Sequence, residues 1–269
     1  MTSASASPSA TGVMVVGAQG RMGLEVRAAL AAEPRLRFAG ALERPGHSEV
    51  GQTIAPGVVL EDDPKRALAG CGVAIDFSVP ASTLVNLRAA ADAGVAYVTG
   101  TTGFDAAGLR ELEQLAERIP VIHTANFSVA VNVLAHLARE AARLLGPRYD
   151  AELFELHHGQ KRDAPSGTAL LLGRAVAQGR GVDLEKHMVL ERAGEIGVRP
   201  TGAIGIQTLR GGDNPGEHTI YFLGRGERLE LTHRAATRGH FAAGAVHAAA
   251  WILGRKPGLY RFEQVLELV

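Results

Sequence analysis

The chain has 269 residues, 46% of them hydrophobic, which is enough for one large domain or two smaller ones. Lys and Arg together number 28, as do Asp and Glu, so the formal net charge is zero and no global field attracts nucleic acid or an anionic membrane. The single cysteine, Cys71, excludes an intrachain disulfide and a cysteine-rich zinc site, and no run of roughly 18 apolar residues is present to span a membrane.

The N-terminal residues are rich in Ser and Ala and lack the basic and apolar regions of a secretory signal peptide. We therefore expect residues 1–11 to form a disordered tail. Cys71 is expected to be a small buried residue rather than a nucleophile. These features favour a reducing compartment, and we expect a cytoplasmic protein with no nucleic-acid or membrane partner.

Short β-branched runs alternate with helical stretches as far as residue 123. Fully apolar strands between helices are typical of a parallel sheet that is covered on both faces, so this half is predicted to be α/β. The expected strands are 13–16, 36–42, 72–77, 95–99 and 120–123, and the expected helices are 22–32, 80–93 and 104–118.

The pattern changes near Ser128, where we place a domain boundary. A helix over 129–145, a strand over 151–157 and a helix over 166–177 are followed by three strand-like runs with Gly-rich turns, which predict an antiparallel meander in an α+β domain. The three runs are 204–209, 218–222 and 228–232. Periodicity does not show which half receives the last helix, at 241–253.

A Gly-rich turn follows the first strand and opens the first helix. Gly17 allows a tight turn, Gly20 keeps side chains away from a diphosphate, and Gly23 permits close packing of helix on strand. The helix N-terminus offers free amides and a positive dipole to phosphates. Gln19 occupies the usual place of the second Gly, and an ordinary strand-to-helix turn is the alternative interpretation.

Two further features of the sequence are suited to binding a dinucleotide. Glu43 ends the second strand, 20 positions after Gly23, where a carboxylate accepts the ribose hydroxyls of NAD. Arg44 follows it, and Arg21 lies in the turn, so two guanidinium groups are available for the 2′-phosphate of NADP. This combination predicts use of both NADH and NADPH, unless Arg44 is only a solvated surface charge.

Two later loops follow strands of the same predicted sheet. Gly100–Gly103 and Thr124–Phe127 lie where ligands of open α/β sheets bind, and their small residues suit a nicotinamide. Each loop taken alone is more typical of a plain connection than of a ligand site.

The segment 155–169 carries the strongest chemical signal. His157, His158 and Lys161 place three cationic groups beside a helix start at Ser166, an arrangement suited to binding carboxylates and donating a proton. A metal site is the first alternative, but adjacent histidines on a strand point to opposite faces and no third ligand has suitable spacing. A surface histidine pair followed by a helix cap is the second.

Over nearly the whole chain from Val13, the sequence resembles the 4-hydroxy-tetrahydrodipicolinate reductase family, also called dihydrodipicolinate reductase. The central signature is 157–169, supported by 17–23, 100–104, 126–128, 210–213, 216–219 and 256–260. The departures are Gln19 in the glycine turn and the N-terminal tail.

The resemblance implies a doubly wound Rossmann domain of residues 12–128 plus 239–269, and a mixed-sheet domain of residues 129–238 that binds substrate and forms a homotetramer. It implies NAD(P)H-dependent reduction of 4-hydroxy-tetrahydrodipicolinate, a small dicarboxylate, with loss of water, in lysine and diaminopimelate biosynthesis. His157 would be the catalytic acid/base and Lys161 a proton donor, while His158, Gly167 and Thr168 would bind the substrate carboxylates. The implied cofactor contacts are Gly17, Ala18, Gln19, Gly20, Arg21, Met22, Glu43, Arg44, Gly100, Thr101, Thr102, Thr124, Ala125, Asn126 and Phe127.

Two other classes share part of this pattern. Another Rossmann oxidoreductase, such as an amino-acid dehydrogenase, would have the glycine turn without the histidine–lysine segment. A non-catalytic NADP sensor would bind the dinucleotide without turnover. The reductase hypothesis requires the side chains of His157 and Lys161 to face the nicotinamide across a cleft between the two halves.

Overall fold

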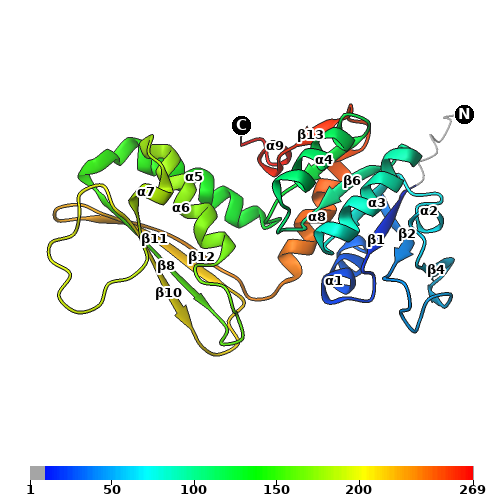
Figure 1. Cartoon of the computed structure of the whole chain (residues 1–269), viewed down its shortest axis with the longest axis horizontal. Helices are drawn as coiled ribbons and strands as arrows, with labels where there is room; N and C mark the ends of the chain where they lie inside the picture. The colour runs from blue at the N-terminus through cyan, green and yellow to red at the C-terminus, as the bar shows by residue number, and fades with distance from the viewer. Residues whose placement is uncertain (1–9, 269) are drawn as a thin grey trace, which may run out of the picture. The chain divides into compact units, whose positions relative to one another are not determined.

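The structure is a computed structural model that describes residues 10–268 (Figure 1). Most of the predicted tail lies outside these residues, but Thr11 does not belong to a tail, because it begins the first strand. Within the described residues, the chain divides into one compact unit of 10–127 with 239–267 and a second of 128–238. The division lies one residue from the expected boundary.

The first unit contains an eight-stranded sheet of order β13-β7-β6-β5-β1-β2-β4-β3. Every pair in it is parallel except β3 with β4. Five of these strands were predicted from the sequence, whereas the short strands β3, β4 and β13 were not. The strands are β1 Thr11–Val16, β2 Leu36–Leu42, β3 Thr53–Ala55, β4 Val58–Glu61, β5 Val73–Asp76, β6 Ala96–Thr99, β7 Pro120–His123 and β13 Gly258–Tyr260.

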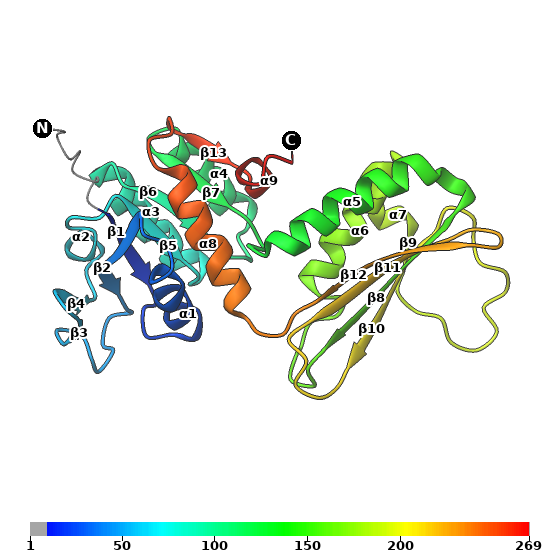
Figure 2. The ribbon, with the colours of Figure 1, turned by 180° about the vertical axis from the view of Figure 1, so that it is seen from behind.

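Helices cover both faces of this sheet, as the apolar strands predicted. One hydrophobic core lies under α1, α8 and α9, and the other under α2, α3 and α4 (Figures 1 and 2). The last long helix therefore packs in the first unit, which settles the point that periodicity left open. The helices are α1 Arg21–Leu30, α2 Pro64–Ala67, α3 Pro80–Ala93, α4 Ala106–Ala116, α8 Gly239–Ile252 and α9 Phe262–Val265.

The second unit has a five-stranded mixed sheet of order β12-β11-β8-β10-β9, with α5, α6 and α7 on one face (Figure 1). Side chains of β8 alternate between the buried helix-covered face and a less buried one. The elements are α5 Val129–Leu145, η1 Gly146–Arg148, β8 Asp150–His157, α6 Gly167–Arg180, α7 Leu184–His187, β9 Met188–Val189, β10 Ile204–Arg210, β11 Glu217–Leu223 and β12 Arg228–Arg234.

The expected three-strand meander is wrong. Only β11 and β12 form an antiparallel hairpin, whereas β8 lies between β11 and β10 and pairs in parallel with β10. The connection from β10 to β11 spans residues 211–216, long enough to pass the end of β8. Because β8 pairs with β10, the buried carboxylate of Glu155 on β8 can accept hydrogen bonds from Thr208 and Arg210 on β10.

Local signals explain where several helices begin. Ser128, Asp105 and Ser166 each precede a helix and accept a hydrogen bond from an amide of its first turn, which satisfies one otherwise unpaired donor. Gly94 and Gly181 end α3 and α6 in the left-handed conformation that favours glycine. Among residues 10–268, no helix is both long and apolar enough to cross a membrane.

Candidate active site

The glycine turn joins β1 to α1 as the sequence predicted. Gly17 has φ +64°, and a Cβ on Gly23 would lie 2.0 Å from the Gly17 carbonyl oxygen, so any side chain at position 23 would collide with the turn. Gly20 is the N-cap of α1 and provides no side-chain cap. The first amides of α1 are therefore not capped by that residue, which suits an anionic ligand.

Glu43 supports this turn from the end of β2. Its carboxylate accepts hydrogen bonds from the backbone amide of Gln19 at 3.0 Å and from that of Arg44 at 3.3 Å. The Gln19 side chain is anchored beside α1, since its Oε1 accepts from Arg27 at 2.6 Å and its Nε2 donates to Glu49. The residue that departs from the glycine pattern is thus tied into a polar network.

A pocket of about 580 Å³ adjoins Glu43 and Arg44. It combines apolar walls for a planar base with hydroxyl, amide and charged groups for a sugar and phosphate, so its residues fit the adenosine part of a dinucleotide. Of the residues that line this pocket, Gly17, Glu43 and Arg44 were predicted from the sequence. The lining residues that follow β4 and β5 were not predicted. The lining residues are Val16, Gly17, Leu42, Glu43, Arg44, Pro45, Asp62, Pro64, Ser78, Val79, Ala81, Ser82, Val85 and Asn86.

Several predicted cofactor residues have side chains in the protein core. Ala18, Thr101, Asn126 and Phe127 are buried, and Met22 packs against the same core as Phe127. The buried members would therefore meet a ligand mainly through backbone groups. The more accessible predicted residues, including Arg21, Arg44 and Thr102, can use side chains.

The loop after β6 is braced by hydroxyl groups. The Thr101 hydroxyl lies 2.8 Å from the Thr83 hydroxyl, and its carbonyl lies 3.0 Å from Nε2 of His123. A Cβ on Gly100 would lie 2.3 Å from the Phe77 ring, so this position requires glycine. The Thr124 amide donates to Thr99 at 3.2 Å, which joins the second predicted loop to β6.

Behind these loops, Asp76 is fully buried and accepts hydrogen bonds from the Ser78 amide at 2.7 Å and from the Tyr97 hydroxyl at 2.6 Å. Burial, reinforced by the Asp76 carboxylate, raises the pKa of Tyr97 well above its usual range. Both residues were missed, because a buried polar pair inside apolar strands leaves no pattern in the sequence.

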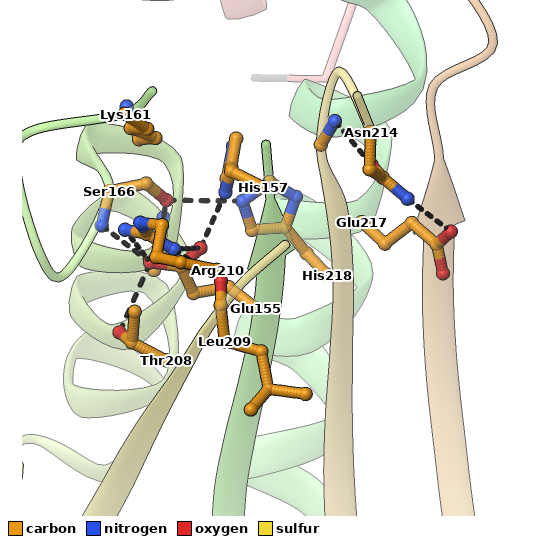
Figure 3. A network of polar contacts seen from close by, with 12 residues as sticks. Glu155, His157, Lys161, Ser166, Thr208, Leu209, Arg210, Asn214, Glu217 and His218 are labelled. Atoms are coloured by element: carbon orange, nitrogen blue, oxygen red, sulfur yellow. Dashed lines mark hydrogen bonds and ion pairs between the residues drawn. The ribbon is translucent and has the colours of Figure 1, made fainter. Parts of the chain in front are cut away.

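The polar site of the second unit is centred on Glu155, not on a histidine pair (Figure 3). Glu155 and His157 are two residues apart on β8 and therefore lie on one face, where Glu155 is fully buried and His157 is 7% exposed. The Glu155 Oε2 lies 2.5 Å from Nδ1 of His157.

Four other donors converge on the same carboxylate. The Arg210 guanidinium donates to both oxygens at 2.8 and 3.0 Å, the Ser166 amide donates at 2.9 Å, and the Thr208 hydroxyl at 3.2 Å. Burial opposes ionisation of Glu155, but the hydrogen bonds from His157, Arg210 and Ser166 outweigh it and hold the pKa well below its usual range. Glu155 is therefore ionised at physiological pH, with Arg210 as its counter-ion.

His218 lies against His157 from the neighbouring strand β11. The two ring centroids are 5.1 Å apart with edge-to-face geometry, and Nε2 of His218 lies 3.2 Å from the Ser166 hydroxyl. Burial, followed by the nearby His157, lowers the pKa of His218 to about 3. His218 is consequently neutral at physiological pH.

The structure brings the other predicted residues of 157–169 near this centre. The Lys161 ammonium lies 2.9 Å from Asp163, a counter-ion not anticipated, and Nε2 of His158 lies 3.5 Å from Arg238. Gly167 begins α6 and is exposed at its N-terminus, with Thr168 next to it. Cationic side chains and the N-terminus of a helix are groups that suit carboxylates.

Sequence reasoning missed the roles of Glu155, Arg210 and His218 in this network. A usable signal existed for Glu155, because a polar residue two positions before His157 on an alternating strand must share its buried face. Arg210 and His218 come from distant strands whose pairing was mispredicted. Within residues 10–268, no group of three or more His, Cys, Asp or Glu side chains is placed to hold a metal ion.

Comparison with known proteins matches both units to one family. Residues 11–127 match the family described as "Dihydrodipicolinate reductase, N-terminus" and residues 130–266 match its C-terminus. The 4-hydroxy-tetrahydrodipicolinate reductase of Anaeromyxobacter sp. (strain Fw109-5) is 49% identical over 95% of this chain and 97% of the relative. The enzyme of that name from Thiobacillus denitrificans is 48% identical over 95% and 98%.

Two solved structures show a similar fold. A dipicolinate-bound dihydrodipicolinate reductase from Paenisporosarcina sp. TG-14 has a TM-score of 0.77 at 22% identity, covering 94% of this chain and 97% of that one. GenD2 from gentamicin A biosynthesis, solved with NAD, has a TM-score of 0.63 at 16% identity, covering 100% and 93%.

A glycine turn on a parallel sheet, joined to a mixed-sheet unit with a histidine–lysine site, defines a two-domain oxidoreductase of the pyridine-nucleotide-dependent class. With matches over both units and relatives nearly half identical, the chain belongs to the dihydrodipicolinate reductase family. Membership makes it an oxidoreductase of lysine and diaminopimelate biosynthesis.

Proposed function

We propose that this chain reduces 4-hydroxy-tetrahydrodipicolinate to tetrahydrodipicolinate, with loss of water, at the expense of NADH or NADPH. The observation that carries the proposal is the imidazole of His157, oriented by a buried carboxylate and close to the start of α6. The names of the close relatives, and the dipicolinate bound to a protein of similar fold, support a small dicarboxylate substrate.

Binding of the substrate carboxylates is assigned to His158, Lys161 and the amides of Gly167 and Thr168. The Ser166 side chain caps the Ala169 amide at 3.1 Å, and Gly167 is exposed at the N-terminus of α6, where the helix dipole suits an anionic ligand. The Lys161 ammonium would exchange its contact with the partly exposed Asp163 for a substrate carboxylate, and could also donate a proton.

Proton transfer is assigned to His157. When bound, the reduced nicotinamide supplies hydride to the conjugated ring that remains after loss of water. Negative charge then develops toward the ring nitrogen and C3, and His157 donates the proton that neutralises it, directly or through water. That the side chains of His157 and Lys161 face the nicotinamide stays a prediction.

We propose use of both NADH and NADPH. Glu43 already accepts two backbone amides, and its oxygens retain capacity for ribose hydroxyls. Arg44 is exposed at the edge of the adenosine pocket and Arg21 is exposed at the start of α1, so both can reach a 2′-phosphate. Dissociation constants for the two reduced cofactors should be of similar magnitude, and a difference above a thousandfold would refute dual use.

We also propose a homotetramer in the cytoplasm. One face of the second sheet carries no helix, and the apolar side chains of Leu209 and Leu223 on it are 50% and 37% exposed. A second copy could bury this face. The cytoplasmic location is supported by a substrate made in a biosynthetic pathway, and fractionation of the source cells would test it.

The decisive experiment follows NADPH oxidation at 340 nm with the freshly prepared pathway intermediate. The wild-type chain should turn over, and His157→Asn should lower kcat by about 10²–10⁴-fold, because a positioned acid typically contributes that much. The variant should bind NADPH with unchanged affinity, because His157 lies outside the dinucleotide-binding unit.

The outcomes separate the competing functions. An amino-acid dehydrogenase would oxidise NADPH with a keto acid and ammonia but not with this intermediate. A dinucleotide sensor would bind NADPH without any turnover. Full activity of His157→Asn would remove the proposed acid.

A further inference from the structure

We propose that Glu155 is a positioning residue for the reduction, which fixes the His157 imidazole with its proton on Nδ1 and keeps Nε2 as the atom that delivers protons to the substrate. The inference rests on the proposed function, but part of its test does not require turnover.

The geometry determines the tautomer. Glu155 is fully buried and its pKa is held low, so it accepts hydrogen bonds and cannot donate one. The atom 2.5 Å from its Oε2 is Nδ1 of His157, which must therefore carry a hydrogen. Neutral histidine in water favours the other tautomer, so the carboxylate imposes the less common form.

The charges around His157 come from several elements. On its own strand lies the Glu155 carboxylate, on β10 the Arg210 guanidinium, and on β11 the neutral His218. The ion pair of Lys161 and Asp163 lies in the following loop. Glu155 is thus the anion in direct contact with the imidazole, and it stabilises the imidazolium that must form before each proton delivery.

The His157 ring is also held by packing. The His218 ring stands edge to face against it, with the two ring centroids 5.1 Å apart. Arg210 also donates to the Asp163 carbonyl at 2.7 Å, which ties the loop bearing Lys161 to the same carboxylate. Glu155 therefore organises both proposed proton donors.

The test replaces the carboxylate while keeping its shape, as Glu155→Gln. We expect kcat to fall about 10²-fold with KM for the dicarboxylate changed less than threefold, since the Glu155 side chain is fully buried behind His157. Without the anion, and with Arg210 uncompensated, the imidazolium is less stable. The pH above which kcat declines should therefore move to lower pH by about one unit or more.

Two variants complete the comparison. Glu155→Asp retains a carboxylate and should restore part of kcat and return the pH profile toward that of the wild type. Glu152→Gln is the matched control, because Glu152 is also on β8 and pairs with Arg192 and Arg199 but lies on the opposite face. Its pH profile should equal that of the wild type.

A measurement on the wild type needs no variant to remain active. Nitrogen-15 NMR of the histidine rings, with His157 assigned by comparison with His157→Asn, should show hydrogen on Nδ1 when the ring is neutral. Hydrogen on Nε2 in the wild type, or an unshifted pH profile in folded Glu155→Gln, would overturn the inference. Absence of any wild-type turnover would instead refute the proposed function. The NMR measurement would still show whether Glu155 fixes the tautomer of His157.

Discussion

Gly216 lies beside the Nε2 edge of His157. It has φ +150°, which side chains rarely adopt, and a Cβ would lie 2.9 Å from Nε2 and 3.3 Å from Cδ2 of the ring. The absence of a side chain at this position therefore avoids a steric clash with the imidazole edge. A glycine that the sequence suggested only as part of a turn has a second purpose at the site.

Replacing Gly216 by Ala should lower kcat about tenfold or more, because the new methyl group covers Nε2 and displaces the ring. Steady-state kinetics with a parallel thermal unfolding measurement would check this. The control is Gly212→Ala in the same loop, where φ is +59° and no heavy atom lies within 4 Å of the added Cβ. That variant should cost about 1 kcal/mol of stability with kcat nearly unchanged. Equal loss of kcat in both variants would show that loop strain, not coverage of Nε2, is responsible.

Among the elements, α1 depends on a close approach to the glycine turn that precedes it. Gly23 lies in its first turn, where a Cβ would lie 2.0 Å from the Gly17 carbonyl oxygen and 2.8 Å from Cα of Ala18. These are backbone atoms, which cannot move aside as a flexible side chain could. The helix must therefore shift away from β1 if any side chain is added.

We expect Gly23→Ala to reduce the free energy of unfolding by about 1–3 kcal/mol and to weaken NADPH binding at least tenfold. Chemical denaturation and fluorescence titration would measure the two effects. Leu24→Ala is the control, since Leu24 is the next residue on α1 and is 52% exposed. It should change stability by about 0.5 kcal/mol or less. Wild-type NADPH affinity in Gly23→Ala would argue against the glycine turn as the diphosphate site.

The elements also show where sequence reasoning succeeds. Strands 36–42 and 120–123 and helices 80–93 and 129–145 have the predicted bounds, because hydrophobic periodicity and Pro or Ser start signals act locally. Strand order in the second sheet depends on which distant strand satisfies buried Glu155. Local turns between 209 and 218 do not encode that choice, so the meander was predicted wrongly.

The candidate site divides in the same way. Residues 157–169 could be found because their chemical types cluster in sequence, and the glycine turn because its spacing is fixed by the ligand. Arg210 and His218 reach His157 only through the pairing of β8 with β10 and β11. When a site is built from side chains on several strands, its residues can be predicted from the sequence only if the strand order is predicted correctly.

At the scale of the whole molecule, the helix-free face of the second sheet is the surface that we propose joins the copies of the chain in a tetramer. If four copies join there, the 28.2 kDa chain should sediment as a tetramer. Leu209→Glu places a charge on this face and should yield smaller species in analytical ultracentrifugation. Leu144→Glu is the control, because Leu144 is 66% exposed on α5, which packs on the other face. A wild-type monomer, or a tetramer that survives Leu209→Glu, would exclude this interface.

The return of the chain to the first unit after residue 238 has a consequence for biosynthesis. A ribosome makes the segment with the glycine turn before the second unit and α8 after it, yet α8 supplies a large part of the hydrophobic core beneath that turn. The first unit therefore cannot complete its core until α8 has been made. The second unit, whose residues are consecutive, can fold during that interval. We therefore expect the second unit to complete its fold before the first unit does, although the first unit begins earlier in the chain.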